Sequence, residues 1–445
     1  MSQHRLKTLD VTFIVAGLVI GMGIFRTPSE VARHAQGSEA VYFWAWILGG
    51  AVSFIGSFIF AEIGTRLPVS GGFYKVFSRV YHPVVAFMVN WILVISNAGA
   101  TTAVTLLGSS YLHSFLHDFG GRFGYSLNIS EGSIALCTIA FLWGFNLLGL
   151  KMSSRLINIL MIIKIGLMVF LISALFWVTP SPAVHDLPPA PFSWKNLLLC
   201  FVPIFFTFGG YQSIINFGGD IDQPKRTIPK AVLGGILLIM VLYMAINWSY
   251  VSALGLPHMA STNTLASDLT FLMGGAQAQL FLNLLFYLAV MSFANVTLIS
   301  SSRIYVAMAE EGVLPKVFQK LSKSKQVPVW GIGFFCVVMV LSVVFLESFQ
   351  KILGYVMFFD SIGFILGAAS IFWLRKKAAE APNEIFEMKG YPWGPILFVL
   401  IYLGVTISVM LQDPQAFWIG LGLFLAGFPL YFILKKLLKK SHESA

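Results

Sequence analysis

Charged residues are scarce in this sequence. Asp, Glu, Lys and Arg make up 11% of its 445 residues, whereas soluble domains average about 25%. Hydrophobic residues make up 57% and the mean hydropathy is +0.81. This composition excludes a soluble protein and indicates an integral membrane protein. Because the apolar residues are spread evenly, we expect one transmembrane unit over residues 1–445 and no separate soluble domain.

The sequence also lacks the motifs of common enzymes. It has no phosphate-binding loop, so ATP is not expected to drive it directly, and neither the His-Glu-x-x-His nor the Gly-x-Ser-x-Gly pattern occurs. Cys137, Cys200 and Cys336 all lie in apolar segments, which argues against disulfides and a metal site. A multi-span membrane enzyme is a rival class, but no nucleophile–base set lies at one depth. We therefore expect no enzyme and no cofactor.

Apolar runs of about 20 residues are long enough to cross a bilayer. The sequence contains twelve, at 9–34, 41–65, 84–112, 131–149, 155–178, 196–219, 229–254, 276–308, 328–346, 350–374, 393–411 and 415–435. The first run follows the N-terminus without a small-residue cleavage site, so we expect no cleaved signal peptide.

The 29 lysines and arginines indicate the orientation. With the N-terminus inside, most of them fall in loops on the inner side, which is the side that positive charge favours. This predicts a protein of the cytoplasmic membrane with both termini in the cytoplasm and an even number of spans. The charges would face anionic lipid headgroups, so we expect the lipid bilayer and not nucleic acid as the partner.

Glycines interrupt the first span, in the stretch Val15–Phe25. A glycine in a helix interior costs about 1 kcal/mol relative to alanine, and a spanning segment cannot leave backbone polar groups facing lipid. Gly21-Met22-Gly23 is therefore either a helix break turned toward the protein interior or a site of close helix packing through small residues.

A second interruption lies in the sixth span, where Gly209 and Gly210 fall near the middle. Spans one and six are five helices apart and run in opposite directions. Paired interrupted segments at corresponding positions of two halves indicate a transporter site built on an inverted repeat. This correspondence favours the helix break over simple close packing.

Two charged residues lie at membrane depth. Lys164 is about 14 Å into the fifth span, where an unpartnered lysine costs at least about 2.5–3.5 kcal/mol. Its stem is too short to snorkel, which favours a functional or structural pairing. Asp360 is similarly deep in the tenth span, and two roles stay open: a titrating group or a fixed partner for a helix end. Glu62 lies near the inner end of the second span, where a solvated or paired structural role is favoured.

Five segments together resemble the amino acid–polyamine–organocation superfamily, and within it the L-type amino acid transporter family and its bacterial relatives. The segments cover the chain in the family's order, at residues 21–28, 62–72, 206–211, 301–315 and 390–395. The resemblance implies an all-α membrane protein of the LeuT type with twelve transmembrane helices. It implies a five-plus-five inverted repeat over 9–178 and 196–374, with helices 1 and 6 broken. Two additional helices and a tail follow in 393–440.

The resemblance also implies an L-amino acid held between the two breaks. The start of the half-helix after the first break suits a carboxylate, which we assign to Gly21, Met22 and Gly23. Free carbonyls suit the ammonium group, and Phe206 matches the family's gating aromatic residue. The expected substrate-binding residues are Val19, Ile20, Gly21, Met22, Gly23, Ile24, Phe206, Thr207, Phe208, Gly209 and Asn295.

Lys164 matches the lysine of the fifth span in this family. Its ammonium group can bond span-one carbonyls and span-eight side chains such as Ser292 or Asn295, where sodium-coupled relatives hold a cation. We therefore expect transport without sodium. Two departures from the family pattern are Met22, which replaces a serine, and Gly218-Gly219-Asp220, which stands where many relatives have a Thr-Glu-Glu-like run.

The expected function is secondary transport of neutral L-amino acids with small to medium side chains, by alternating access and sodium-independent exchange. The alternative is a proton-coupled symporter in which Asp360 or Glu62 titrates. A pure sensor would bind substrate without flux. Bacterial relatives usually work alone, and the short N-terminal tail offers no docking segment, so we expect no obligatory partner subunit.

Overall fold

The computed structural model describes residues 5–21, 23–122, 125, 129–179, 190–262, 264–322, 327–345, 349–377 and 385–443. Its regular elements over these residues are helices, together with two isolated β-bridges. The α-helices are α1 (Thr8–Val19), α2 (Gly23–Ala35), α3 (Glu39–Arg66), α4 (Gly72–Val80), α5 (Pro83–Arg122), α6 (Glu131–Asn146), α7 (Leu150–Ile172), α8 (Ala174–Trp177), α9 (Trp194–Phe208), α10 (Pro224–Ser261), α11 (Leu265–Glu310), α12 (Val329–Phe345), α13 (Phe349–Lys377), α14 (Trp393–Gln412) and α15 (Pro414–Glu443). Three short 3-10 helices are η2 (Tyr211–Asn216), η3 (Gly218–Asp220) and η4 (Lys316–Gln319).

Ten helical segments in the described residues are long and apolar enough to cross a membrane. They correspond to ten of the predicted spans. The remaining two predicted spans, 131–149 and 328–346, coincide with α6 and α12, which have 16 and 17 residues. The protein is therefore an all-helical, multi-pass membrane protein.

Two of the long helices extend beyond the predicted spans because glycines bend the chain there. In α10, Gly255 has φ 74° and ψ 153°. In α11, Gly275 has φ 66° and ψ −163°. Almost only glycine adopts this region, because a Cβ atom would clash with the backbone. The ends of the two helices therefore turn away at Gly255 and Gly275.

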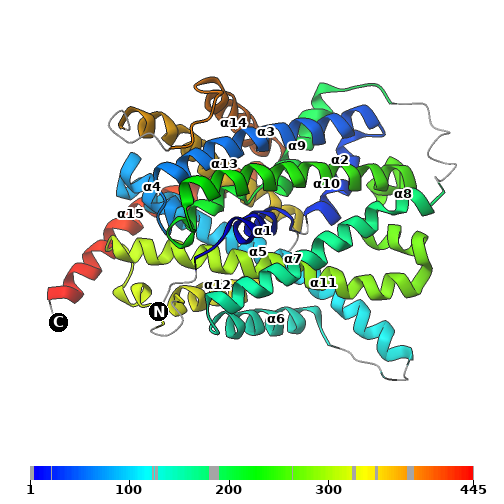
Figure 1. Ribbon diagram of the computed structural model, residues 1–445, viewed down its shortest axis with the longest axis horizontal. Helices are drawn as coiled ribbons and strands as arrows, with labels where there is room; N and C mark the ends of the chain where they lie inside the picture. The colour runs from blue at the N-terminus through cyan, green and yellow to red at the C-terminus, as the bar shows by residue number, and fades with distance from the viewer. Residues whose placement is uncertain are drawn as a thin grey trace.

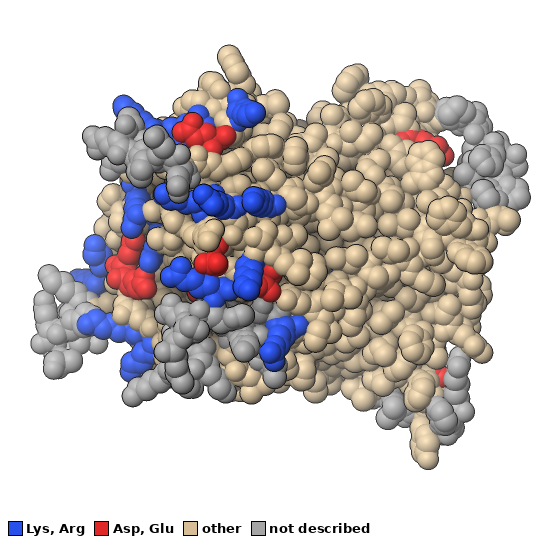
Figure 2. All heavy atoms as spheres, in the orientation of Figure 1, with Lys and Arg blue, Asp and Glu red and all other residues tan. Residues whose placement is uncertain are grey.

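Both chain termini lie at the same end of the molecule, on the left in Figure 1. The lysine and arginine side chains visible in Figure 2 gather at that same end, whereas the opposite half of this face is mostly uncharged. Positive charge on this face and the two chain ends are therefore found at the same end of the molecule.

The first interrupted helix, α1, lies at the centre of the bundle (Figure 1). α1 packs against α10 and α7, and α2 packs against α9 and α10. α5 and α11, the two longest helices, pack along each other beside them. The polar ends that the interruptions create are therefore covered by neighbouring helices, which is where a membrane protein tolerates irregular backbone.

We predict that Gly275→Ala lowers stability because its backbone conformation is strained for any residue with a Cβ atom, at a cost of about 1–3 kcal/mol. The measurement is the apparent melting temperature of purified protein in detergent. Gly166→Ala is the control, because Gly166 lies within α7 and an added Cβ atom would meet no neighbour within 4 Å. Equal melting temperatures for the two variants would contradict the assignment of strain to Gly275.

Candidate functional site at the two helix breaks

The two interruptions touch each other through glycines. α1 ends at Val19 and α2 begins at Gly23, whereas α9 ends at Phe208 before Gly209 and Gly210. A Cβ atom on Gly23 would lie 3.0 Å from the Thr207 Oγ1 atom. Gly210 has φ 112°, and a Cβ atom there would overlap the carbonyl oxygen of Leu18. The close approach of the two breaks therefore requires glycine at both positions.

The side chain of Tyr243 on α10 joins the two breaks. Its hydroxyl lies 3.1 Å from the Val19 carbonyl oxygen and 3.3 Å from the Thr207 carbonyl oxygen, and it can donate to either. Its ring packs against Trp46 and Phe208. The last carbonyls of α1 and α9 thus share one donor. No pattern in the sequence distinguishes this tyrosine from the other aromatic residues of the spans.

Lys164 on α7 is fully buried, and its ammonium group donates to the Ile20 carbonyl at the first break. This is the contact with span one that the family resemblance implies. The structure shows no hydrogen bond from Lys164 to Ser292 or Asn295. Instead, the Asn295 side-chain oxygen accepts from Asn146 at 2.7 Å, and Asn295 lies outside the cavity described next.

A cavity opens beside the breaks and contains about 720 Å³ of space not filled by atoms, its mouth included. Residues from α1, α2, α5, α9, η2, α11 and α13 line it. The lining includes seven of the predicted site residues: Val19, Gly21, Gly23, Phe206, Thr207, Gly209 and Asp360. The structure therefore brings both breaks and one intramembrane carboxyl group to a single cavity.

Several predicted site residues do not line this cavity. Ile20 points its carbonyl to Lys164, and Ile24 is completely buried. Phe208 is packed between Trp46 and Tyr243. Met22, the departure from the family's serine, lies outside the described residues.

The prediction missed a polar stripe on each of two long helices. Asn97 and Thr101 on α5, and Thr297 and Ser301 on α11, line the cavity. Each pair is spaced four residues apart, so both members lie on one helix face. Polar residues repeated at helical spacing inside an apolar span were the signal that could have identified them.

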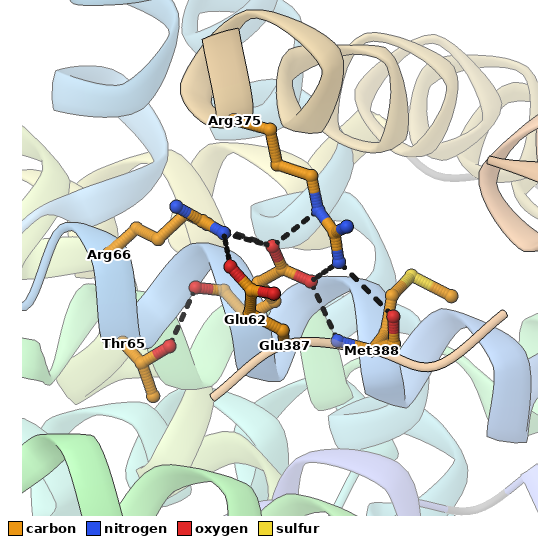
Figure 3. A network of polar contacts seen from close by, with 6 residues as sticks. All are labelled: Glu62, Thr65, Arg66, Arg375, Glu387 and Met388. Carbon is orange, nitrogen blue, oxygen red and sulfur yellow. Dashed lines mark hydrogen bonds and ion pairs between the residues drawn. The ribbon is translucent and has the colours of Figure 1, made fainter. Parts of the chain in front are cut away.

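Glu62 takes part in a separate network at the end of α3 (Figure 3). Its carboxylate is fully buried and accepts hydrogen bonds from Arg66 at 2.8 Å and from Arg375 at 2.8 and 2.7 Å. The Met388 backbone N–H donates to the same carboxylate at 2.8 Å, and Arg66 also pairs with Glu387 at 3.0 Å. Glu62 thus fastens the segment before α14 to α3 and does not line the cavity.

Asp220, at the second departure from the family pattern, bonds both α11 and the N-terminal segment. Its carboxylate accepts a hydrogen bond from Arg303 at 2.6 Å, and the Arg303 guanidinium lies 4.3 Å from the centre of the Phe217 ring. The Leu6 N–H donates to the Asp220 carbonyl at 2.9 Å, and the Asp222 N–H donates to the Leu6 carbonyl at 2.9 Å. The N-terminal segment therefore pairs with the chain that follows η3.

The fold combines long apolar helices with two touching helix breaks and a cavity beside them, which is the architecture expected of a membrane transporter. Comparison with known proteins agrees: the family model described as Amino acid permease matches residues 6–430. The chain belongs to the amino acid permease family. It is a membrane transporter and not an enzyme.

Similar proteins are also transporters. The chain is 25% identical to the serine/threonine exchanger SteT of Bacillus subtilis (strain 168), over 98% of this chain and 97% of that protein. It is 25% identical to the human large neutral amino acids transporter small subunit 2, over 94% of this chain and 78% of that protein. It is 24% identical to the branched-chain amino acid permease BcaP of Bacillus subtilis (strain 168), over 98% of this chain and 93% of that protein.

We predict that Glu62→Gln destabilises the protein, because it removes the carboxylate that pairs with Arg375 and leaves the buried Arg66 guanidinium with Glu387 alone. Breaking a buried ion pair costs about 3–5 kcal/mol, so the apparent melting temperature should fall clearly. The matched control is Glu310→Gln, since Glu310 pairs with Lys75 at 2.5 Å but its side chain is 47% exposed. A surface pair contributes about 0–1 kcal/mol. If both variants melt alike, Glu62 is not the clamp that we describe.

Proposed function

We propose that this protein is a secondary transporter that carries L-amino acids across the cytoplasmic membrane by alternating access. The proposal includes twelve transmembrane helices, with α6 and α12 as the two shorter ones. It includes a LeuT-type inverted repeat over 9–178 and 196–374, followed by two additional helices and the tail in 393–440. Residues 1–445 form one transporter domain.

The observation that carries this proposal is the contact of the two breaks at the edge of the cavity. The first N–H groups of α2, beginning at Gly23, have no acceptor within the helix. A helix N-terminus attracts a carboxylate through these groups and its dipole. The last carbonyls of α1 and α9 lie beside it, and a carbonyl oxygen with one bonded donor can still accept a second. Backbone groups alone can therefore bind both charges of an amino acid.

The relatives support amino acids as the substrate class, because the names of the exchanger, the large neutral amino acid transporter and the branched-chain permease all specify them. The described residues that line the cavity include one ionisable group, Asp360, and no lysine, arginine or histidine that could pair with an acidic side chain. We propose substrates with a neutral side chain. Phe206 and Phe293 take up part of the lining, so we propose side chains that are small to medium.

Lys164 supports sodium-independent exchange. Its ammonium group donates to the Ile20 carbonyl at the first break, and in our proposal it takes the part that a coupling cation has in sodium-coupled relatives. A charge that cannot leave provides no ion gradient to drive net uptake. Exchange also requires that the empty carrier reorients slowly, and a permanent tie between α7 and the first break is consistent with this.

The charge distribution supports a cytoplasmic location for both termini, because lysines and arginines gather at the end where the termini lie (Figure 2).

We further propose that the chain functions without an obligatory partner subunit. Co-purification of a stoichiometric second protein that is required for transport would contradict this part.

The first experiment measures uptake of labelled L-amino acids by purified protein in liposomes. We expect uptake into liposomes preloaded with an unlabelled amino acid, little uptake into empty ones, and no effect of replacing sodium by choline. Uptake that requires a sodium gradient, or that is equal in empty and preloaded liposomes, would contradict exchange.

Lys164→Ala should lower exchange at least about tenfold, since one buried charge-assisted hydrogen bond contributes about 1.5–3 kcal/mol. The variant must still elute as a folded protein. Lys195→Ala, at the exposed start of α9, is the control and should exchange normally. Full activity of folded Lys164→Ala would remove this lysine from the mechanism.

The position of Asp360 favours one second candidate, proton-coupled symport. Asp360 lines the cavity, whereas Glu62, which is bonded to Arg66 and Arg375, does not. If Asp360 carries the proton, an inwardly directed proton gradient should drive net uptake into empty liposomes, and Asp360→Asn should abolish that drive. If the gradient drives no uptake into empty liposomes, symport is wrong and exchange stands.

A further inference from the structure

We infer that the cavity contains a second subsite, which binds the side chain of the substrate through hydrogen bonds. The structure assigns it to five polar side chains: Asn97, Ser213, Thr297, Ser301 and Asp360. The preferred substrates are then neutral amino acids whose side chains carry a hydroxyl or a carboxamide. This inference rests on the transport function proposed above and specifies its substrate class.

The five side chains come from four different elements. Asn97 lies on α5, Ser213 on η2, Thr297 and Ser301 on α11, and Asp360 on α13. All of them line the same cavity as the two helix breaks. Their meeting is a result of the tertiary fold, because no two of these four elements are consecutive spans.

None of the five side chains makes a hydrogen bond to another described residue. Their neighbours in the lining behave differently: the Thr101 hydroxyl donates to the Asn97 carbonyl at 2.6 Å, and the Gln212 side chain accepts from the Gly210 N–H at 2.8 Å. Thr297 and Ser301 are nevertheless only 7% and 2% exposed. Buried polar groups are normally hydrogen-bonded, so these side chains are available to a ligand.

The chemistry of the five groups selects the ligand. A hydroxyl both donates and accepts, and the Asn97 carboxamide has donors and an acceptor, while a carboxylate only accepts when ionised. A substrate hydroxyl or carboxamide can match this mixture. A lysine-like ammonium only donates, so it could pair with the Asp360 carboxylate but would leave the Asn97 donors unmatched. A branched hydrocarbon would cover all five groups and satisfy none of them.

The zwitterion does not need these side chains. The exposed N–H groups at the start of α2 and the carbonyls at the ends of α1 and α9 are assigned to its carboxylate and ammonium groups. Asn97, Thr297 and Asp360 are therefore left for the remaining part of the substrate. Substrate choice in this protein then depends on α5, α11 and α13, and not on the broken helices.

The test compares pairs of amino acids of equal shape in the liposome exchange assay. L-threonine is matched with L-valine, L-asparagine with L-leucine, and L-ornithine is added as the cationic probe. A site built on hydrogen bonds discriminates strongly against an analogue that lacks the group. We expect threonine and asparagine to compete at least about tenfold better than valine, leucine and ornithine.

Thr297→Val tests the subsite directly because it replaces a hydroxyl by a methyl group of the same size. The threonine-to-valine ratio should fall several-fold, and Thr297→Ser, which keeps the hydroxyl, should retain it. Thr270→Val is the matched control on α11, since the Thr270 hydroxyl donates to the Ala266 carbonyl at 2.7 Å and lies outside the cavity. It should leave the ratio unchanged.

The outcomes separate this inference from the proposed function. If wild-type protein exchanges none of the five amino acids, the transport function itself is wrong. If it exchanges them but prefers valine and leucine, or prefers ornithine, only the subsite is wrong. The subsite is equally wrong if Thr297→Val and Thr297→Ser change uptake of threonine and valine by the same factor.

Discussion

The contact between the two interrupted helices is the constraint on which the rest of the structure depends. Gly23 lies against Thr207, and Gly210 lies against the Leu18 carbonyl. Side chains at these glycines would push the breaks apart. Because the two breaks are in contact, the start of α2 and the ends of α1 and α9 border one cavity. Each break presents backbone groups that a continuous helix would have used internally, and the neighbouring helices shield them from lipid.

Other buried polar contacts hold this arrangement from outside. Tyr243 joins the ends of α1 and α9, and Lys164 fixes the Ile20 carbonyl from α7. Glu62 acts farther away, where its contacts with Arg66 and Arg375 fasten the chain before α14 to α3 (Figure 3). The first two contacts lie at the breaks, so they bear on transport. The third lies outside the cavity, so it bears on stability.

The sequence was most informative where the cause of a feature is local. Glycines in apolar runs predicted both interruptions, and hydropathy predicted the long helices. The depth of Lys164 predicted that this lysine has a partner, and the family resemblance implied that the partner is a carbonyl of span one. The sequence was less informative where the partners of a side chain come from distant helices. Asn295 bonds Asn146 instead of lining the cavity, and the alignment of Asn97 with Thr297 depends on how α5 and α11 pack. A span count based on apolar residues also could not show that α6 and α12 are short.

The central claim is that backbone groups at the two breaks bind the two charges of an amino acid. An experimental structure with a bound L-amino acid tests it most directly. The account predicts the carboxylate within hydrogen-bond distance, about 2.7–3.2 Å, of N–H groups at the start of α2, and the ammonium group at carbonyls that end α1 or α9. An amino acid bound elsewhere, or held at both charged ends by side chains, would contradict the account.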